Sequence, residues 1–162
     1  MRRTPLERVL ASLPNYGEAL AAELFGRRGE SVRIDFRTGS DAAADAGLRG
    51  RCHDNVARWL GANPGDRAVR GWLIDEHHSN CGFVEFHAHS VIVDSMDALR
   101  DITLSHADPA HPFLPDARPD EEFLAIARFR PTLRHVFDDA LYGAFIQAVD
   151  ASILNGGLDN PY

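Results

Sequence analysis

The alternation of apolar and polar positions predicts both helices and strands in the first third of the chain. Apolar residues recur at helical spacing between residues 4 and 26, and Pro14 divides this pattern into two short helices. Residues 31–37 alternate apolar and polar side chains, which is typical of a half-buried strand. Residues 38–50 are small, polar and rich in glycine, so we expect a loop there.

The central part predicts one helix followed by extended segments. Residues 52–62 carry apolar side chains at helical spacing, and the sequence NPGD that follows is typical of a helix end. Three segments rich in β-branched and aromatic residues come next, namely 67–75, 82–94 and 98–103. The last two are separated by DSMD, which fits a hairpin turn, so we expect these strands to be antiparallel.

The last third combines a proline-rich connection with helical periodicity. The stretch after residue 104 contains four prolines and indicates a surface excursion, whereas residues 123–129 fit either a strand or a helix. Residues 136–153 place apolar side chains at helical spacing. The order of helices and antiparallel strands predicts an α+β fold, and a chain of this length fits a single domain, residues 1–162.

Composition and charge narrow the classes of protein that fit the chain. Hydrophobic residues make up 44% and charged residues 25%, as in ordinary globular proteins. The formal charge of −7 would repel a phosphate backbone, so we expect no nucleic-acid partner. No run approaches the roughly 18 apolar residues of a membrane span, and the N-terminus is unlike a signal peptide. We therefore expect no membrane contact and a cytoplasmic location, although signal-less export would leave no trace.

Two cysteines are too few for a disulfide framework, and one of them stands where a reactive thiol is expected. Cys52 opens the predicted helix, where unpaired backbone N–H groups and the helix dipole favour a thiolate. Arg49 and Arg51 would favour the thiolate as well. A small buried structural cysteine is the alternative for Cys52, and we interpret Cys81 as structural or incidental.

A nucleophilic cysteine needs a base and a group that orients the base. His87 and His89 share one face of the predicted strand VEFHAHSVIV, so either could serve as the base. The next strand offers Asp101. A two-residue hairpin loop would place Asp101 opposite Ser90, on the wrong face, whereas one additional residue would place it opposite Val91 and diagonal to His89. A His–Asp pair therefore requires the second register.

These residues carry a resemblance to a known class of enzyme. The order of cysteine at a helix start, histidine on a strand and an acidic or amide residue on a later strand resembles papain-like thiol hydrolases, including the bacterial cell-wall peptidases. The motifs are also similar to small uncharacterised bacterial proteins with the pattern C-H-x-N, G-W, H-x-V and D-I/V-T. Here they are CHDN at 52–55, GW at 71–72, HSV at 89–91 and DIT at 101–103. The turn DSMD lacks the group's usual glycine.

The resemblance implies a papain-like α+β fold, with the cysteine-bearing helix packed on an antiparallel sheet. It implies that Cys52 is the nucleophile, His89 the general base and acid, and Asp101 the residue that orients His89. The reaction would be hydrolysis or acyl transfer at an amide or peptide bond, on a peptide or protein substrate and without a cofactor. The Cys52 backbone N–H is one candidate oxyanion donor, and His53 or Asn55 is a candidate for another.

Other interpretations remain open at the level of sequence. Cys52 with nearby histidines is a possible zinc set, and HHSNC at 77–81 has suitable spacing, although no paired C-x-x-C is present. A non-catalytic interaction or immunity protein that keeps the fold is a third possibility. Trp72, beside Gly71, fits either a core anchor or the wall of a substrate cleft. His87 remains an alternative base, and the oligomeric state is unknown.

Overall fold

The structure is a computed structural model that describes residues 4, 16–36, 50–104, 108 and 110–154. Its helical elements are α2 (Tyr16–Arg27), η1 (Arg28–Glu30), α3 (Cys52–Ala62), η4 (Ser79–Cys81), α4 (Asp120–Phe129) and α5 (Asp139–Leu154). Its strands are β1 (Asp35–Phe36), β2 (Arg67–Asp75), β3 (Phe83–Val93), β4 (Leu99–Asp101), β5 (Phe113–Pro115) and β6 (Thr132–Val136). Helices and a largely antiparallel sheet give an α+β architecture.

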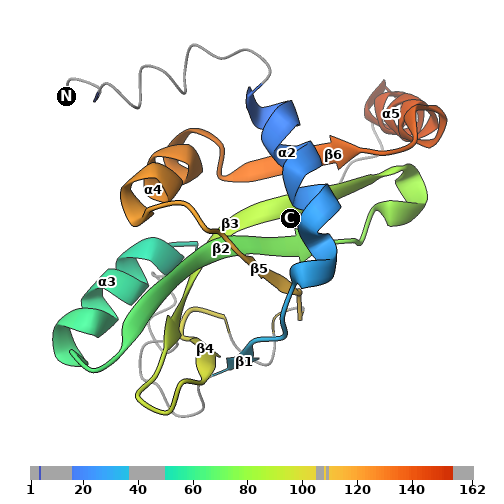
Figure 1. Cartoon of the computed structure of the whole chain (residues 1–162). Helices are drawn as coiled ribbons and strands as arrows, with labels where there is room; N and C mark the ends of the chain where they lie inside the picture. The colour runs from blue at the N-terminus through green and yellow to red at the C-terminus, as the bar shows by residue number, and fades with distance from the viewer. Residues whose placement is uncertain (1–3, 5–15, 37–49, 105–107, 109, 155–162) are drawn as a thin grey trace.

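The sheet is built around one long hairpin. β2 and β3 pair along their whole length, from Arg67 opposite Val93 to Asp75 opposite Glu85. The strand order is β1-β4-β3-β2-β5, and β1 with β4 is the parallel pair. Figure 1 shows this hairpin running the length of the molecule, with α3 near one end and α5 near the other.

The outer edge of β3 is shared by two short strands that leave a gap between them. β6 pairs with Phe83–His87, and β4 pairs with Ile92 and Val93. Between them, the Ala88 N–H donates to the carbonyl of Pro131, 2.8 Å away. The N–H and C=O of one strand residue point to the same edge, so the Ala88 carbonyl also faces this gap. The gap is where α3 begins against the sheet.

Apolar side chains on one face of β3 form the main core. Val84 and Phe86 pack with residues of α2 and α4, and further along the same face Ile92 packs with Val56 of α3. Alternation along the strand places these residues on a single face. The three helices therefore cover one side of the sheet, and burial of α3 against Ile92 fixes where its first residue lies.

The predicted elements agree with the structure where periodicity is strong. The expected helices at 52–62 and 136–153 correspond to α3 and α5, and the three expected strands correspond to β2, β3 and β4. The ambiguous segment at 123–129 is helical, within α4. The expected strand at 31–37 is reduced to the two residues of β1 and a bridge between Val32 and Phe113.

The sequence analysis did not predict two of the strands, and two of its predictions fall outside the described residues. β5 lies within the stretch expected to be a surface excursion, and β6 precedes the last helix. Both are short and flanked by proline, so neither shows the period expected of a strand. The first predicted helix, before Pro14, and the predicted loop up to residue 49 lie outside the described residues. No helix in the described ranges is long and apolar enough to cross a membrane.

Candidate active site

Cys52 is the first residue of α3, as the sequence predicts. Gly50, two residues earlier, has φ of 77°, a left-handed conformation that favours glycine and lets the chain turn into the helix. Cys52 is buried, and its Sγ lies 3.8 Å from the carbonyl oxygen of Ala88, to which the protonated thiol can donate. Arg51 pairs with Asp54 at 2.7 Å. The nucleophile candidate therefore sits at the open edge of β3.

The turn between β3 and β4 sets the register that a His–Asp pair needs. The Asp94 N–H donates to Ala98 O, so three residues form the loop rather than two. The last of them, Asp97, has φ of 64°. A left-handed third residue is typical of three-residue hairpin loops, and aspartate tolerates it better than most residues. Ile92 then pairs with Arg100, and continuing that register places Asp101 opposite Val91.

His89 and Asp101 form a buried pair. His89 Nε2 lies 2.7 Å from Asp101 Oδ2, and the two side chains are 6% and 1% exposed. The other carboxylate oxygen accepts hydrogen bonds from the backbone N–H groups of Thr103 at 2.7 Å and Leu104 at 2.9 Å. Burial opposes ionisation, but the His89 bond and these N–H groups together lower the pKa of Asp101. The pair leaves His89 Nδ1 as the nitrogen that can serve the thiol.

The thiol and the imidazole shift each other's pKa in opposite directions. Burial raises the pKa of Cys52, but hydrogen bonds with His53 and His89 outweigh it and lower the value to about 6. Burial lowers the pKa of His89, but its bonds to Asp101 and Cys52 outweigh it and raise the value to about 9. Between these values Cys52 is a thiolate and His89 an imidazolium, as in an activated cysteine nucleophile.

A second histidine lies beside the thiol and is held there by a polar chain. His53 Nδ1 is 3.7 Å from Cys52 Sγ and 2.6 Å from Ser90 Oγ. The buried Arg70 guanidinium donates to the same Ser90 oxygen at 2.7 Å and to Asp120 at 3.1 Å. Sequence reasoning missed Ser90 and Arg70. The sequence did carry a signal for them, because both are polar residues at positions of β2 and β3 that face the core.

Asn55, a candidate oxyanion donor in the sequence, makes a positioning contact in the structure. Its buried amide Nδ2 donates to Thr103 Oγ1 at 3.1 Å. This bond joins α3, which carries Cys52, to the segment directly after Asp101. The Asn55 amide therefore links the two sides of the site, and its oxyanion role stays a prediction. Of the two candidate oxyanion donors, His53 is the one whose side chain contacts the thiol.

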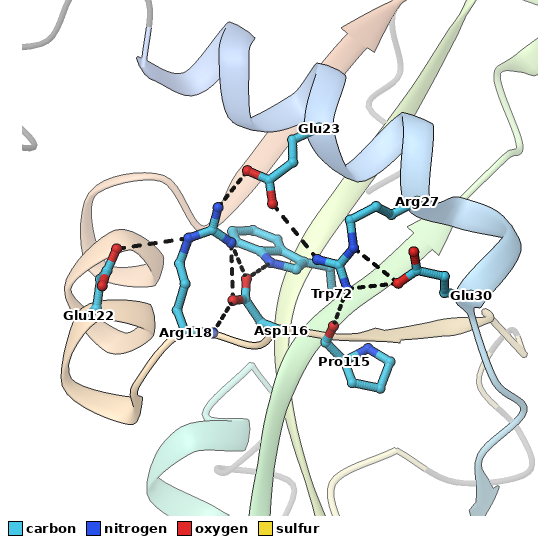
Figure 2. Close-up of polar contacts among 8 residues, drawn as sticks. All are labelled: Glu23, Arg27, Glu30, Trp72, Pro115, Asp116, Arg118 and Glu122. Atoms are coloured by element: carbon cyan, nitrogen blue, oxygen red, sulfur yellow. Dashed lines mark hydrogen bonds and ion pairs between the residues drawn. The ribbon is translucent and has the colours of Figure 1, made fainter.

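Trp72 does not line a substrate cleft. Its side chain is fully buried in the core, and the indole N–H donates to Asp116 Oδ2 at 2.8 Å. Figure 2 shows Asp116 held in turn by Arg118, which also reaches Glu23 of α2. The core interpretation of Trp72 is therefore correct, and its expected substrate contact is wrong because no ring surface reaches solvent.

His87 lies away from the thiol interactions. Its Nδ1 is 3.1 Å from Thr132 Oγ1, and its Nε2 lies near Asp75 and Glu85. The alternation of β3 does place His87 and His89 on one face, as expected. The hydrogen bonds distinguish them, since only His89 is engaged with both Asp101 and Cys52.

His53 and His89 contact the Cys52 thiol, but in the described part of the chain no group of three possible metal ligands around Cys52 lies within 4.8 Å of one another. Among the residues that the structure describes, the group of three possible ligands within 4.8 Å of one another is Asp75, Glu85 and His87. In the HHSNC segment, His78 stacks on Phe83, and the Cys81 thiol donates to the Asn80 side chain.

Comparisons with protein-family models, with curated proteins and with solved structures find no match to this chain.

Proposed function

We propose that this protein is a cysteine-dependent acyl-transfer enzyme that acts on amide or peptide bonds, with hydrolysis as the overall reaction. The observation that carries the proposal is the arrangement of three side chains. Cys52 opens a helix against the edge of β3, and the neighbouring His89 is bonded to the buried carboxylate of Asp101 at 2.7 Å. Nucleophile, base and orienting group are the three parts that such chemistry requires.

In the proposed mechanism, the Cys52 thiolate attacks the carbonyl carbon and forms a tetrahedral oxyanion. The C–N bond breaks as the oxyanion collapses, and the His89 imidazolium gives its proton to the leaving amine. A thioester on Cys52 remains. His89, now neutral, takes a proton from water, whose oxygen attacks the thioester. The C–S bond then breaks, releasing the carboxylic acid and restoring the thiolate and imidazolium.

Asp101 supports both halves of this cycle by holding His89. Its carboxylate fixes the ring through Nε2, which leaves Nδ1 for proton exchange with the thiol and the leaving group. The carboxylate is itself fixed by two backbone N–H groups, from Thr103 and Leu104. The backbone N–H of Cys52, at the start of α3, is the proposed oxyanion donor because the first N–H groups of a helix have no partner within it.

The proposed architecture is papain-like, as the sequence motifs imply. A cysteine at the start of a helix, packed against a strand that carries the histidine, supports this comparison. A peptide or protein amide is the proposed substrate, and a cytoplasmic site of action is proposed with it. The acidic composition supports neither nucleic acid nor a membrane surface as partner.

Trapping of an acyl-enzyme tests the proposal directly. Cys81→Ser protein would be incubated with a panel of activated esters and peptide amides, quenched in acid, and examined by intact-protein mass spectrometry and peptide mapping. We expect one acyl group per chain, on Cys52, which disappears as free acid accumulates. Cys52→Ala in the same background should acquire none. Labelling that is equal in the two variants, or an adduct on Cys52 that never turns over with any acyl donor, would contradict the proposal.

A further inference from the structure

A second cluster of polar side chains lies along the β2–β3 hairpin, apart from the thiol. Asp75 and Glu85 are directly opposed across the two strands, and His87 is diagonal to Asp75. Alternation places all three on one face. Their side chains are 23%, 18% and 36% exposed, so the cluster is partly shielded and still open to solvent.

The three side chains of this cluster lie close together without hydrogen bonds between His87 and the carboxylates. His87 Nε2 lies 3.8 Å from Asp75 Oδ2 and 4.0 Å from Glu85 Oε2, which is too long for hydrogen bonds. One possible ligand atom from each of the three side chains nevertheless lies within 4.8 Å of the other two. Atoms bound to one metal at about 2.1 Å in a tetrahedral site are themselves about 3.4 Å apart. Binding of a metal would therefore draw these three atoms closer together.

Each of the three side chains is also held by a partner outside the cluster. Asp75 Oδ1 accepts a hydrogen bond from the His77 backbone N–H at 2.9 Å. Glu85 Oε1 accepts two from Arg134, at 2.7 and 3.0 Å. His87 Nδ1 lies 3.1 Å from the Thr132 hydroxyl. Each side chain therefore has an outer hydrogen-bond partner and, besides it, one atom close to the other two side chains, and metal ligands commonly have such outer partners.

We infer that Asp75, Glu85 and His87 form a binding site for a divalent transition-metal ion such as Zn²⁺. Two carboxylate oxygens and one imidazole nitrogen are a mixed ligand set that suits such ions. Arg134 pairs with Glu85, and a bound cation would balance the remaining negative charge of the two carboxylates. Three protein ligands leave at least one coordination position for water or for a ligand from solution.

The site is distinct from the thiol centre and does not depend on the proposed function. Its ligands come from β2 and β3, and β6 supplies the outer partners Thr132 and Arg134, which pair with His87 and Glu85 in the sheet. Formation of the site therefore requires the β2–β3–β6 register. The active-site candidates share β3 with this site, but they depend on α3 and β4 and not on β6.

Zinc titration of the metal-free, reduced full chain tests this inference. A chromophoric chelator would compete for Zn²⁺, and Co²⁺ would serve as a spectroscopic probe. We expect one equivalent bound per chain, with cobalt d–d bands and no thiolate charge-transfer band. Glu85→Gln and His87→Ala should each weaken binding by at least about 10-fold. Thr132→Val, which removes only an outer partner, should weaken it by about 10–100-fold.

Two controls separate this site from its rivals. His77→Ala removes an exposed neighbouring imidazole, and Cys52→Ser removes the thiol, so both should bind zinc as tightly as the unaltered chain does. Circular dichroism of each metal-free variant establishes that it is folded. Loss of binding in Cys52→Ser or His77→Ala, retention of full affinity in both Glu85→Gln and His87→Ala, or no binding at micromolar zinc would overturn the inference.

Discussion

His87 and His89 lie two residues apart on the same face of β3, yet their surroundings give them different chemistry. His89 is almost fully buried, bonded to Asp101 at 2.7 Å and engaged with the Cys52 thiol. His87 is 36% exposed and lies about 4 Å from two carboxylates. The comparison teaches that a shared strand face does not decide the role of a histidine. The elements packed against each histidine decide its role. These elements are α3 and β4 for His89, and β6 for His87.

Loss of the buried histidine should have the largest effect on acyl transfer. In the Cys81→Ser background, His89→Ala removes the base and the acid of the proposed cycle. Removing the equivalent member of a triad typically costs about 10⁴–10⁶-fold in kcat. Turnover of the best acyl donor would be measured, with His77→Ala as the matched histidine control. Because the change leaves Asp101 buried without its partner, His89→Gln offers a second variant. Wild-type turnover in either folded variant would break the contrast between the two histidines.

A smaller loss is expected when only the orienting carboxylate changes. Asp101→Asn keeps the shape of the side chain but removes the negative charge. That charge orients His89 and stabilises its protonated form, so kcat should fall by up to about 10⁴-fold. The pKa of His89 should fall and that of Cys52 should rise, since Asp101 is the first of the interactions that raise the pKa of His89. Kinetics and the pH profile of Cys52 alkylation check both effects. If Asp101→Asn lowers stability but leaves the pH profile of Cys52 alkylation unshifted, the role of Asp101 is only structural.

Loss of the hydrogen bond between Asn55 and Thr103 should affect mainly the stability of the protein. Asn55→Ala removes the donor to Thr103 Oγ1 within a buried pair, which typically costs about 1–3 kcal/mol in the free energy of unfolding. Denaturant titration measures this cost. Thr103→Val removes the other partner, and the double variant should cost less than the sum of the two. Additive costs would show that the bond does not connect α3 to the segment after Asp101.

Sequence reasoning placed Cys52, His89 and Asp101 on their elements because local patterns decide such placements. The Gly-rich turn before an amphipathic segment marks the start of α3, and alternation marks β3. The register of Asp101 could only be stated as a condition. It depends on a left-handed residue, and here Asp97 adopts the conformation that glycine more often supplies.

Contacts that depend on the packing of several strands and helices could not be predicted from the sequence. Ser90 and Arg70 meet His53 only because β2, β3 and α3 pack together. The burial of Trp72 depends on Asp116 and α4, which are distant in the chain. The Asp75, Glu85 and His87 cluster likewise requires the pairing of β2 with β3. Polar residues at core-facing strand positions were a signal for Ser90 and Arg70, but spacing along the chain does not show which side chains meet.

The pH dependence of Cys52 alkylation tests the central claim most directly. In metal-free Cys81→Ser protein, the reaction with iodoacetamide should rise through a pKa of about 6, because His53 and His89 stabilise the thiolate. In His89→Ala, where His53 alone of the two histidines remains, the pKa should rise toward the ordinary thiol value of about 8.5, so the rate at pH 7 should fall by up to about 30-fold. His77→Ala should follow the unaltered profile. An unshifted profile in folded His89→Ala, or a Cys52 that reacts only above pH 8 in the parent protein, would contradict the account.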